Sequence, residues 1–450
     1  MNGRPAARPA RVRPTSLIAI AEFRALVGAR ITQSLGASAL ATVIAFQTYE
    51  VTGDPLALGL LGLVEAIPAL ALMLIGGHLA DRRDRRRIVI VASSALTLAA
   101  LALAVGSLTP TLIGLPLILA VGFVIGVSSG FERPALSALE AQVIPIEHAS
   151  AGTSWIGSSW TLGSILGPVL GGIAVAVVGL PATYFAIVLL LAGSTVFVAL
   201  IKAKPIPEPE ADQSMVESLT SGVRYVAGNQ VLVGSMALDL FAVFFGGAIA
   251  MLPVFATDIL MVGPLGLGLL RTAPAAGALI AMLATARLQP RRRAGPIFLA
   301  CVTIFGVSMV VFGLSSVFIL SLAALFVSGF ADGVSVVIRS LILRVESPEA
   351  MRGRIASVNY VFIGGSNELG AFESGVAASL FGVVPSVVGG GVVTLGVVAL
   401  VAIFAPHLRT LDLAQRMIDG PGAMATAPAG AGPSNDEPHA AAVEVERLAT

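Results

Sequence analysis

Ionisable side chains inside long apolar stretches are the groups of this 450-residue sequence best placed to do chemistry. A charged group at the centre of a bilayer costs at least ~2.5–3.5 kcal/mol, so such a residue is a functional candidate by default. Burial raises the pKa of a carboxyl group and can bring it into the physiological range. A deep carboxylate could therefore bind a proton in one state and release it in another. The candidates for proton coupling are Glu65, Asp239 and Glu368.

The same charged residues could have other roles. Glu65 could form a structural pair with Arg271, or Asp332 with Arg339, and hold helices together. Asp332 and Arg339 are seven residues apart, two turns along one helix face, so a direct pair between them is not expected. Arginines in apolar stretches could instead attract an anionic substrate, and polar residues there could line a cavity or simply bridge helices. The cavity candidates are Arg30, Gln33, Gln47, Trp160, Arg271, Asn359 and Asn367.

Several other chemistries are excluded. Neither lysine follows a glycine, so no P-loop for ATP is present. The nucleophile-elbow pattern fits "GVSSG" at 126–130, but it lies inside an apolar helix with no strand before it. There is no Cys/His cluster for a metal, and the single Cys301 cannot form an internal disulfide. We therefore expect neither an enzyme nor a cofactor or metal, and no surface suited to nucleic acid.

The elements that carry these residues are membrane-spanning helices. The chain is 56% hydrophobic and 12% charged, against roughly 25% charged in soluble domains. A spanning helix needs about 20 apolar residues, and lipid offers no partner for unpaired backbone groups, so an all-α membrane protein is expected. Twelve stretches fit: 25–49, 56–79, 88–108, 115–140, 152–178, 182–201, 231–256, 264–286, 295–314, 317–343, 355–380 and 384–405.

The positive charges fix the expected orientation. They gather in the N-terminal segment, in alternate loops and in the tail, while the six other loops contain no Lys or Arg. Since positive loops stay cytoplasmic, both termini are expected in the cytoplasm of a bacterial cell, with the chain in its inner membrane. The expected organisation is a cytoplasmic segment (1–22), a six-helix bundle (23–201), a linker with an amphipathic helix (202–230), a second six-helix bundle (231–406) and a disordered tail (407–450).

The two bundles are related by an internal repeat. "LGLVEAIPAL" (61–70) aligns with "LGLLRTAPAA" (267–276), and the same offset places the arginines 85–87 on 291–293. Duplicated halves in parallel topology are typical of secondary transporters, whose substrate site lies near the midplane between them.

The stretch "GHLADRRDRR" (77–86) resembles the signature of the major facilitator superfamily between helices 2 and 3, although Asp84 stands where that pattern has Gly. "GPVLGG" (167–172) resembles the Gly-Pro motif of its exporters, and stretches such as "FERPALSALEAQVIP" resemble the subfamily of the enterobactin exporter and its efflux relatives. The residues that match the two motifs, with Arg133 as the candidate for the helix-4 arginine, are Gly77, Asp81, Arg82, Arg85, Arg86, Arg133, Gly167, Pro168, Gly171 and Gly172.

The resemblance implies how such a chain works. Asp81 would engage the start of the eleventh span, near 354–357, and latch the cytoplasmic side in the outward-open state, while Gly77 would let its helix approach a neighbour. The expected function is export of a small amphipathic molecule, a siderophore or a drug, by a monomer that exchanges it for protons. An importer of a small nutrient and a non-transporting receptor or assembly partner are the alternatives.

Overall fold

The computed structural model describes residues 15–109, 111–205, 215–246, 248–288, 290 and 292–419, and these residues form helices and loops with no strand. This confirms the expected all-α class. The helices are α1 (Thr15–Ile18), α2 (Ala21–Thr52), α3 (Pro55–Arg82), α4 (Arg85–Gly106), α5 (Leu115–Val143), η1 (Ile146–His148), α6 (Ala149–Ala199), α7 (Met215–Ala227), α8 (Gln230–Phe245), α9 (Ala248–Val254), η2 (Phe255–Ile259), α10 (Gly263–Leu288), α11 (Ala294–Leu314), α12 (Phe318–Glu346), η3 (Glu349–Met351), α13 (Arg352–Phe381), α14 (Val383–Phe404), α15 (Pro406–Arg409) and α16 (Leu413–Asp419).

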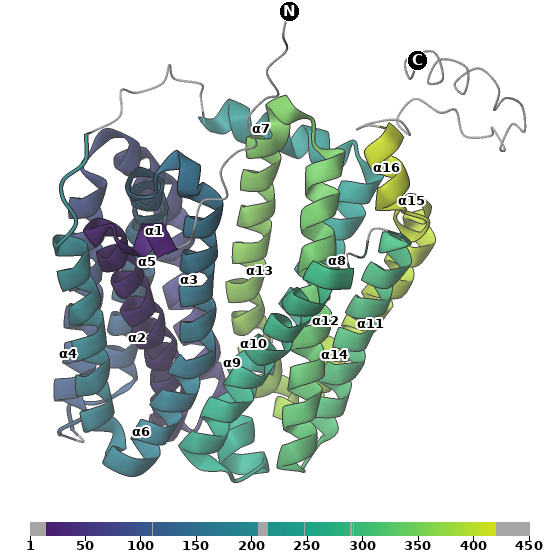
Figure 1. The fold of residues 1–450 in the computed structure, drawn as a ribbon. Helices are drawn as coiled ribbons and strands as arrows, with labels where there is room; N and C mark the ends of the chain where they lie inside the picture. Colours follow the sequence, from purple (N-terminus) through teal and green to yellow (C-terminus); the bar gives the residue numbers. More distant parts are fainter. Residues whose placement is uncertain are drawn as a thin grey trace, which may run out of the picture.

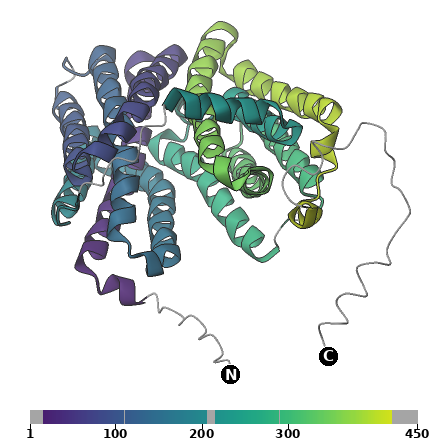
Figure 2. The same ribbon diagram turned by 90° about the horizontal axis from the view of Figure 1, so that it is seen from above.

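The long helices form two groups side by side (Figures 1 and 2). In the N-terminal group, α2 packs on α6 and α3 packs on α5. In the C-terminal group, α10 packs on α12 and α11 packs on α14. The groups meet along two seams, where α3 packs against α13 and α6 packs against α10. Two bundles joined along two pairs of helices leave room for a cavity between the seams.

Among the described residues, nine helical stretches are long and apolar enough to cross a membrane. One of them contains α6, which changes direction at Gly179 (φ 78°, ψ 172°), just where the predicted spans 152–178 and 182–201 meet. Only glycine adopts this backbone conformation easily. Two further long helices, α2 and α13, contain the predicted first and eleventh spans but are not among the nine. Twelve crossings therefore remain a prediction with which the helices are compatible.

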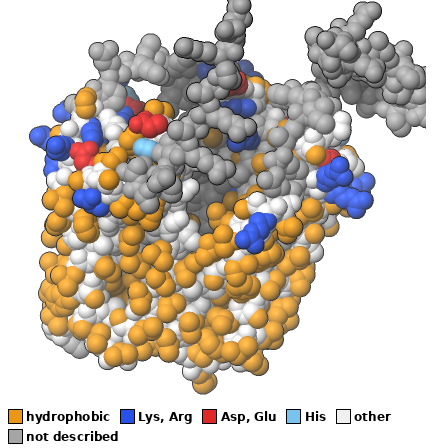
Figure 3. Space-filling model, in the orientation of Figure 1, with side chains coloured by type: hydrophobic (Ala, Val, Ile, Leu, Met, Phe, Trp, Pro, Cys, Tyr) orange, Lys and Arg blue, Asp and Glu red, His pale blue; other side chains and the backbone are white. Residues whose placement is uncertain are grey.

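Apolar side chains cover most of the long face of the molecule that Figure 3 shows. Large residues such as Val177 and Leu189 are 76% and 74% exposed. Such a surface suits lipid rather than water. The charged side chains on the visible face gather toward the end where α7 and α16 lie. We call this end the linker end and the opposite one the far end.

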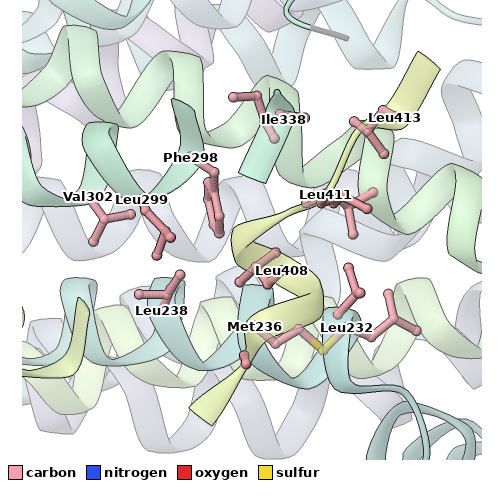
Figure 4. Packing of buried hydrophobic residues seen from close by; sticks show 14 of the residues in the cluster. Leu232, Met236, Leu238, Phe298, Leu299, Val302, Ile338, Leu408, Leu411 and Leu413 are labelled. Atoms are coloured by element: carbon pink, nitrogen blue, oxygen red, sulfur yellow. The ribbon is translucent and has the colours of Figure 1, made fainter. Parts of the chain in front are cut away.

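The chain beyond α14 differs from the expected disordered tail. Residues 406–419 form α15 and α16, which we call the C-terminal strap. Leu408, Leu411 and Leu413 are 0–3% exposed and pack with Phe298 and Ile338 in the core of the C-terminal group (Figure 4). The sequence contains no long apolar run here, because three spaced leucines are enough to anchor a short strap. The remaining tail, 420–450, lies outside the described residues.

Candidate functional site

A cavity of about 410 Å³ lies between the two groups, and we call it the central cavity. Most of its wall is apolar. The ionisable oxygen and nitrogen groups that the wall includes are Glu65 of α3, Asp239 of α8, Arg271 of α10 and Asp332 of α12. Arg271 is eight residues from the far-end start of its helix and Asp332 is fourteen, or roughly 12 and 21 Å at 1.5 Å per residue. The cavity thus holds its charges near the middle of the molecule.

Arg271 crosses the seam between the groups. Its Nη1 donates a hydrogen bond of 2.5 Å to the carbonyl oxygen of Ala41 in α2, and Glu65 is near enough to interact with it electrostatically. Glu65 and Arg271 therefore stand together, as one reading of the sequence expected. An opposite charge beside each group offsets part of the cost of burying it.

Asp239 forms an ion pair with Arg339 of α12, and both side chains are nearly enclosed, at 6% and 7% exposure. A direct pair between Asp332 and Arg339 was not expected from the sequence, and in the structure Arg339 indeed pairs with Asp239. The two residues are 100 positions apart in the chain, so only the packing of α8 on α12 brings them together.

A second cavity, of about 510 Å³, extends from the central cavity into the N-terminal group, and we call it the side cavity. The two cavities share Ala41 and Glu65 in their walls. Three of the predicted lining residues belong to the side cavity, namely Arg30, Gln33 and Trp160, and so does Arg133. Its wall is built by residues that lie toward the linker end of α2, α5 and α6.

The side cavity contains a charged network that the sequence did not assign. The Nε of Arg30 lies 2.6 Å from a carboxylate oxygen of Glu140, and the Oγ of Ser93 donates a 2.8 Å hydrogen bond to the buried Glu132. Glu132 and Glu140 were recognisable as acidic residues in an apolar helix, eight positions apart, yet their partners come from α4 and α2. Their spacing of eight residues, about two helical turns, places them on the same side of the helix and was the available signal.

The other predicted cavity residues are placed elsewhere. Gln47 is buried away from both cavities, where Tyr184 donates to it at 2.7 Å and it donates to Ser107 at 3.0 Å. This is the helix-bridging role that the sequence left open. Asn359 is partly exposed on α13 and is not in either wall. Asn367 and Glu368 lie in the same helix, but their side chains are outside what the structure describes.

Two arginines of the 77–86 stretch cap the ends of helices at the linker end of the N-terminal group. Arg85 donates to the carbonyl oxygens of Ala80 and Ala138, and Arg86 donates to those of Val198 and Ala199. Cations at the last carbonyls of a helix satisfy unpaired acceptors and oppose the negative end of the helix dipole. The side chain of Asp81 is 73% exposed, with Arg85 at 3.8 Å, and Arg82 is the last residue of α3.

Two glycine expectations are resolved at this motif. A Cβ on Gly77 would meet open space, so the expectation of close packing there was wrong; Gly76 is the residue pressed against the backbone of Gly130. Asp84, which replaces the usual Gly, has φ −62° and caps α4 by accepting from the backbone N–H groups of Arg86 and Arg87. The turn therefore needs no glycine, because a capping side chain serves it instead.

The Gly-Pro motif lies on the α6–α10 seam toward the far end. Added Cβ atoms on Gly172 and Gly268 would collide with the carbonyl oxygens of Pro264 and Pro168, respectively. On the α2 side of the same helix, Gly167 packs against Ser38, and Gly171 against Ala39. The motif is thus a junction of three helices where backbones touch, as small residues allow in membranes.

Comparison with known proteins agrees with this architecture. The sequence pattern of the Major Facilitator Superfamily matches residues 26–371. The enterobactin exporter EntS of Shigella boydii serotype 18 is 25% identical over 341 residues, which cover 74% of this chain and 79% of that protein, and EntS of Shigella flexneri matches to the same extent. A peptide transporter POT in complex with sulfate has the same fold at 14% identity, with a TM-score of 0.69 over 89% of this chain and 100% of that one. So does a bacterial homolog to the human lysosomal transporter Spinster, at 12% identity and a TM-score of 0.65 over 91% and 99%. The chain therefore belongs to the Major Facilitator Superfamily, and it is a multi-pass membrane transporter rather than an enzyme.

Proposed function

We propose that this protein is a proton-coupled exporter that moves a small amphipathic molecule across the bacterial inner membrane by alternating access. The observation that carries the proposal is the central cavity, which lies between two helix groups and has ionisable groups in an apolar wall. A mainly apolar pocket with a few convergent polar groups is the usual form of a small-molecule site. In the proposed organisation the bundles are residues 23–201 and 231–406, and residues 1–22, 202–230 and 407–450 are cytoplasmic.

The direction and orientation rest on separate arguments. Positive residues at the linker end favour a cytoplasmic position for that end. Export is favoured by the Gly-Pro motif and by relatives that are named exporters. Those relatives are named for enterobactin, so a siderophore or a drug-like compound is the proposed substrate class.

The conformation fits a transporter that faces the cytoplasm. Gly59 of α3 touches Gly375 of α13 toward the far end, and Thr272 donates a 2.8 Å hydrogen bond across the α6–α10 seam to Ile165. Tyr49 donates a further hydrogen bond to Asp258 at that end. The side cavity meanwhile extends toward the linker end. Opening outward requires these far-end contacts to separate, and the proposed Asp81 latch would then close the other end.

Among the proposed coupling carboxylates, Glu65 has the position that suits the task best. It stands where the two cavities meet and faces Arg271 across the seam. A proton on Glu65 would weaken that interaction, so proton binding and the closure of the seam are linked. Asp239 and Glu368 remain the other candidates.

Reconstituted vesicles with an imposed pH gradient test the proposal. A pool of siderophores and lipophilic cations is offered, and the orientation of the protein is fixed by labelling an added terminal tag. We expect uphill substrate movement opposite to the proton flow, lost in Glu65→Gln. The matched control is Glu373→Gln, a carboxylate outside both cavity walls. Movement together with protons would overturn export, and no proton-linked movement of any compound would overturn coupling.

A further inference from the structure

Within the described ranges of the chain, the charges around the central cavity do not cancel. Its wall includes three carboxylates, and the positive groups beside them are Arg271, near Glu65, and Arg339, paired with Asp239. The remaining carboxylate is Asp332. Among the described residues it makes no hydrogen bond and no ion pair, although it stands in the wall of a cavity that is mostly apolar. When all these groups are ionised, the cavity carries one surplus negative charge.

The groups that face Asp332 offer it little compensation. Arg271 comes from α10, Cys301 from α11, Asp239 from α8 and Glu65 from α3. On its own helix, Ser335 lies one turn away in the same wall, and Arg339 lies two turns away, bound to Asp239. From α13 the wall includes Ala371, and the side chain of Glu368 is outside the described residues. The two arginines near the cavity are thus already engaged with other partners.

A charged carboxylate in an apolar wall costs free energy when no positive group or hydrogen-bond donor lies beside it. A positive ligand removes that cost, and its attraction to the carboxylate is stronger there than in water because the surroundings screen it less. The rest of the wall, with Phe305, Val302 and Ile249, offers rings and aliphatic groups for the apolar part of such a ligand. A small anion would find the opposite, since it would add to the negative surplus.

We propose that Asp332 is the recognition carboxylate of the central cavity and that the ligand it selects is a monovalent amphipathic cation. This narrows the substrate class of the proposed exporter and so rests on the proposed function. A proton satisfies Asp332 in the same way as the cation does. The two therefore compete for one site, and the ligand binds more tightly as the pH rises.

The test measures binding rather than transport. Full-length protein in nanodiscs is titrated with tetraphenylphosphonium, and with triphenylphosphine oxide as a neutral probe of similar rings, by equilibrium dialysis at pH 6, 7 and 8. We expect the cation to bind at one site, at least about tenfold more tightly than the neutral probe, and more tightly at pH 8 than at pH 6. Asp332→Asn should reduce the affinity for the cation at least about tenfold and remove its pH dependence, while Asp332→Glu and the control Glu373→Gln retain both.

Two results would overturn the proposal. One is equal binding of the charged and neutral probes by the unmodified protein, which requires no variant to fold. The other is that Asp332→Asn, shown to be folded by gel filtration, binds the cation as tightly as the unmodified protein does.

An anionic catechol such as 2,3-dihydroxybenzoate separates the proposed export function from the proposed specificity for cations. If the vesicles transport this catechol while the protein does not bind the cation, the proposed export function is retained and the proposed specificity for cations is wrong.

Discussion

In the N-terminal group, Arg30 and Glu132 stand in the wall of the side cavity, and the Arg30–Glu140 pair is 24% and 15% exposed. In the C-terminal group, Asp239 and Arg339 are paired at 6% and 7% exposure. The Arg30–Glu140 pair is partly buried, whereas the Asp239–Arg339 pair is almost fully enclosed, so the loss of one member of the enclosed pair leaves behind a buried charge at a higher cost. The comparison teaches that the N-terminal group leaves its Arg30–Glu140 pair partly exposed, whereas the C-terminal group uses the Asp239–Arg339 pair to fix its packing.

The loops that follow the repeated helices α3 and α10 also differ between the two groups. In the first repeat, Asp84 caps α4 from within its own loop. The repeat offset places Pro290 at the matching position, which has no side chain to cap a helix. Asp412 of the strap supplies the acceptor instead, at 3.4 Å from the backbone nitrogen of Arg293. In the part of the chain that the structure describes, the C-terminal group is therefore completed by a segment after its last long helix, whereas the first repeat caps α4 from within its own loop.

The largest expected effect comes from breaking the enclosed pair. Arg339→Leu leaves Asp239 charged without a partner and should cost about 3–5 kcal/mol of stability. The measurement is the thermal unfolding midpoint in detergent, with Arg344→Gln, an exposed arginine of the same helix, as the control. Adding Asp239→Asn to Arg339→Leu should recover part of the loss. A double variant no more stable than the single one would contradict the role of the pair.

Next in size is the loss of the strap's anchor. Leu408 is fully buried, so Leu408→Ala should cost about 2–5 kcal/mol, and the neighbouring exposed Arg409→Ala should cost little. The same unfolding assay measures both. Removing residues 420–450 should leave the midpoint unchanged. If Leu408→Ala behaved like Arg409→Ala, the strap would not be part of the core.

The Arg30–Glu140 pair is expected to matter more for transport than for stability. Glu140→Gln should cost less than the ~3–5 kcal/mol expected for Arg339→Leu, because the Arg30–Glu140 pair is less completely buried. The transport rate in vesicles should nevertheless fall about tenfold, the equivalent of about 1.4 kcal/mol on the barrier, because Arg30 loses the group that orients it beside the side cavity. A large loss of stability together with unchanged transport would reverse the contrast between the groups.

The smallest effect is expected where the N-terminal group meets the linker. Lys204 lies 2.5 Å from Glu22, which precedes the first predicted span, and this hydrogen bond lowers the pKa of the Glu22 carboxyl. The lowered pKa stabilises the folded state above the ordinary value of 4.5, and this contribution is lost as the pH falls through the folded value. Lys204→Ala should therefore cost less than about 1 kcal/mol at pH 7 and nothing at low pH. Lys202→Ala is the control, because Lys202 reaches Glu22 through its backbone. A cost that did not shrink in acid would show that Lys204 acts by some other contact.

The helices and the depth of most charges could be predicted, because a membrane-spanning helix must be apolar for about 20 residues and any charge within it is conspicuous. Glu65, Asp239 and Arg271 were found in this way, and they do stand in the central cavity. Their partners could not be predicted in general, because a pair such as Asp239 and Arg339 depends on how two helices rotate against each other. Spacing along one helix excluded Asp332 for Arg339 but could not name Asp239.

The motif and the tail show two other limits. Gly77 belongs to the pattern, yet the close contact is made by Gly76, because one residue along a helix turns a side chain by about 100°. The strap escaped prediction because Leu408, Leu411 and Leu413 form no apolar run that stands out beside a spanning helix. Its burial depends on a groove made by helices far away in the sequence.

The strap also determines when the fold can be completed during biosynthesis. The core of the C-terminal group cannot be completed until Leu413 has been made, after all of the long helices that surround it. Until the strap packs, these helices leave an open groove at the linker end. A chain that stops early would keep this groove permanently open, and quality-control proteases could recognise it as unfinished.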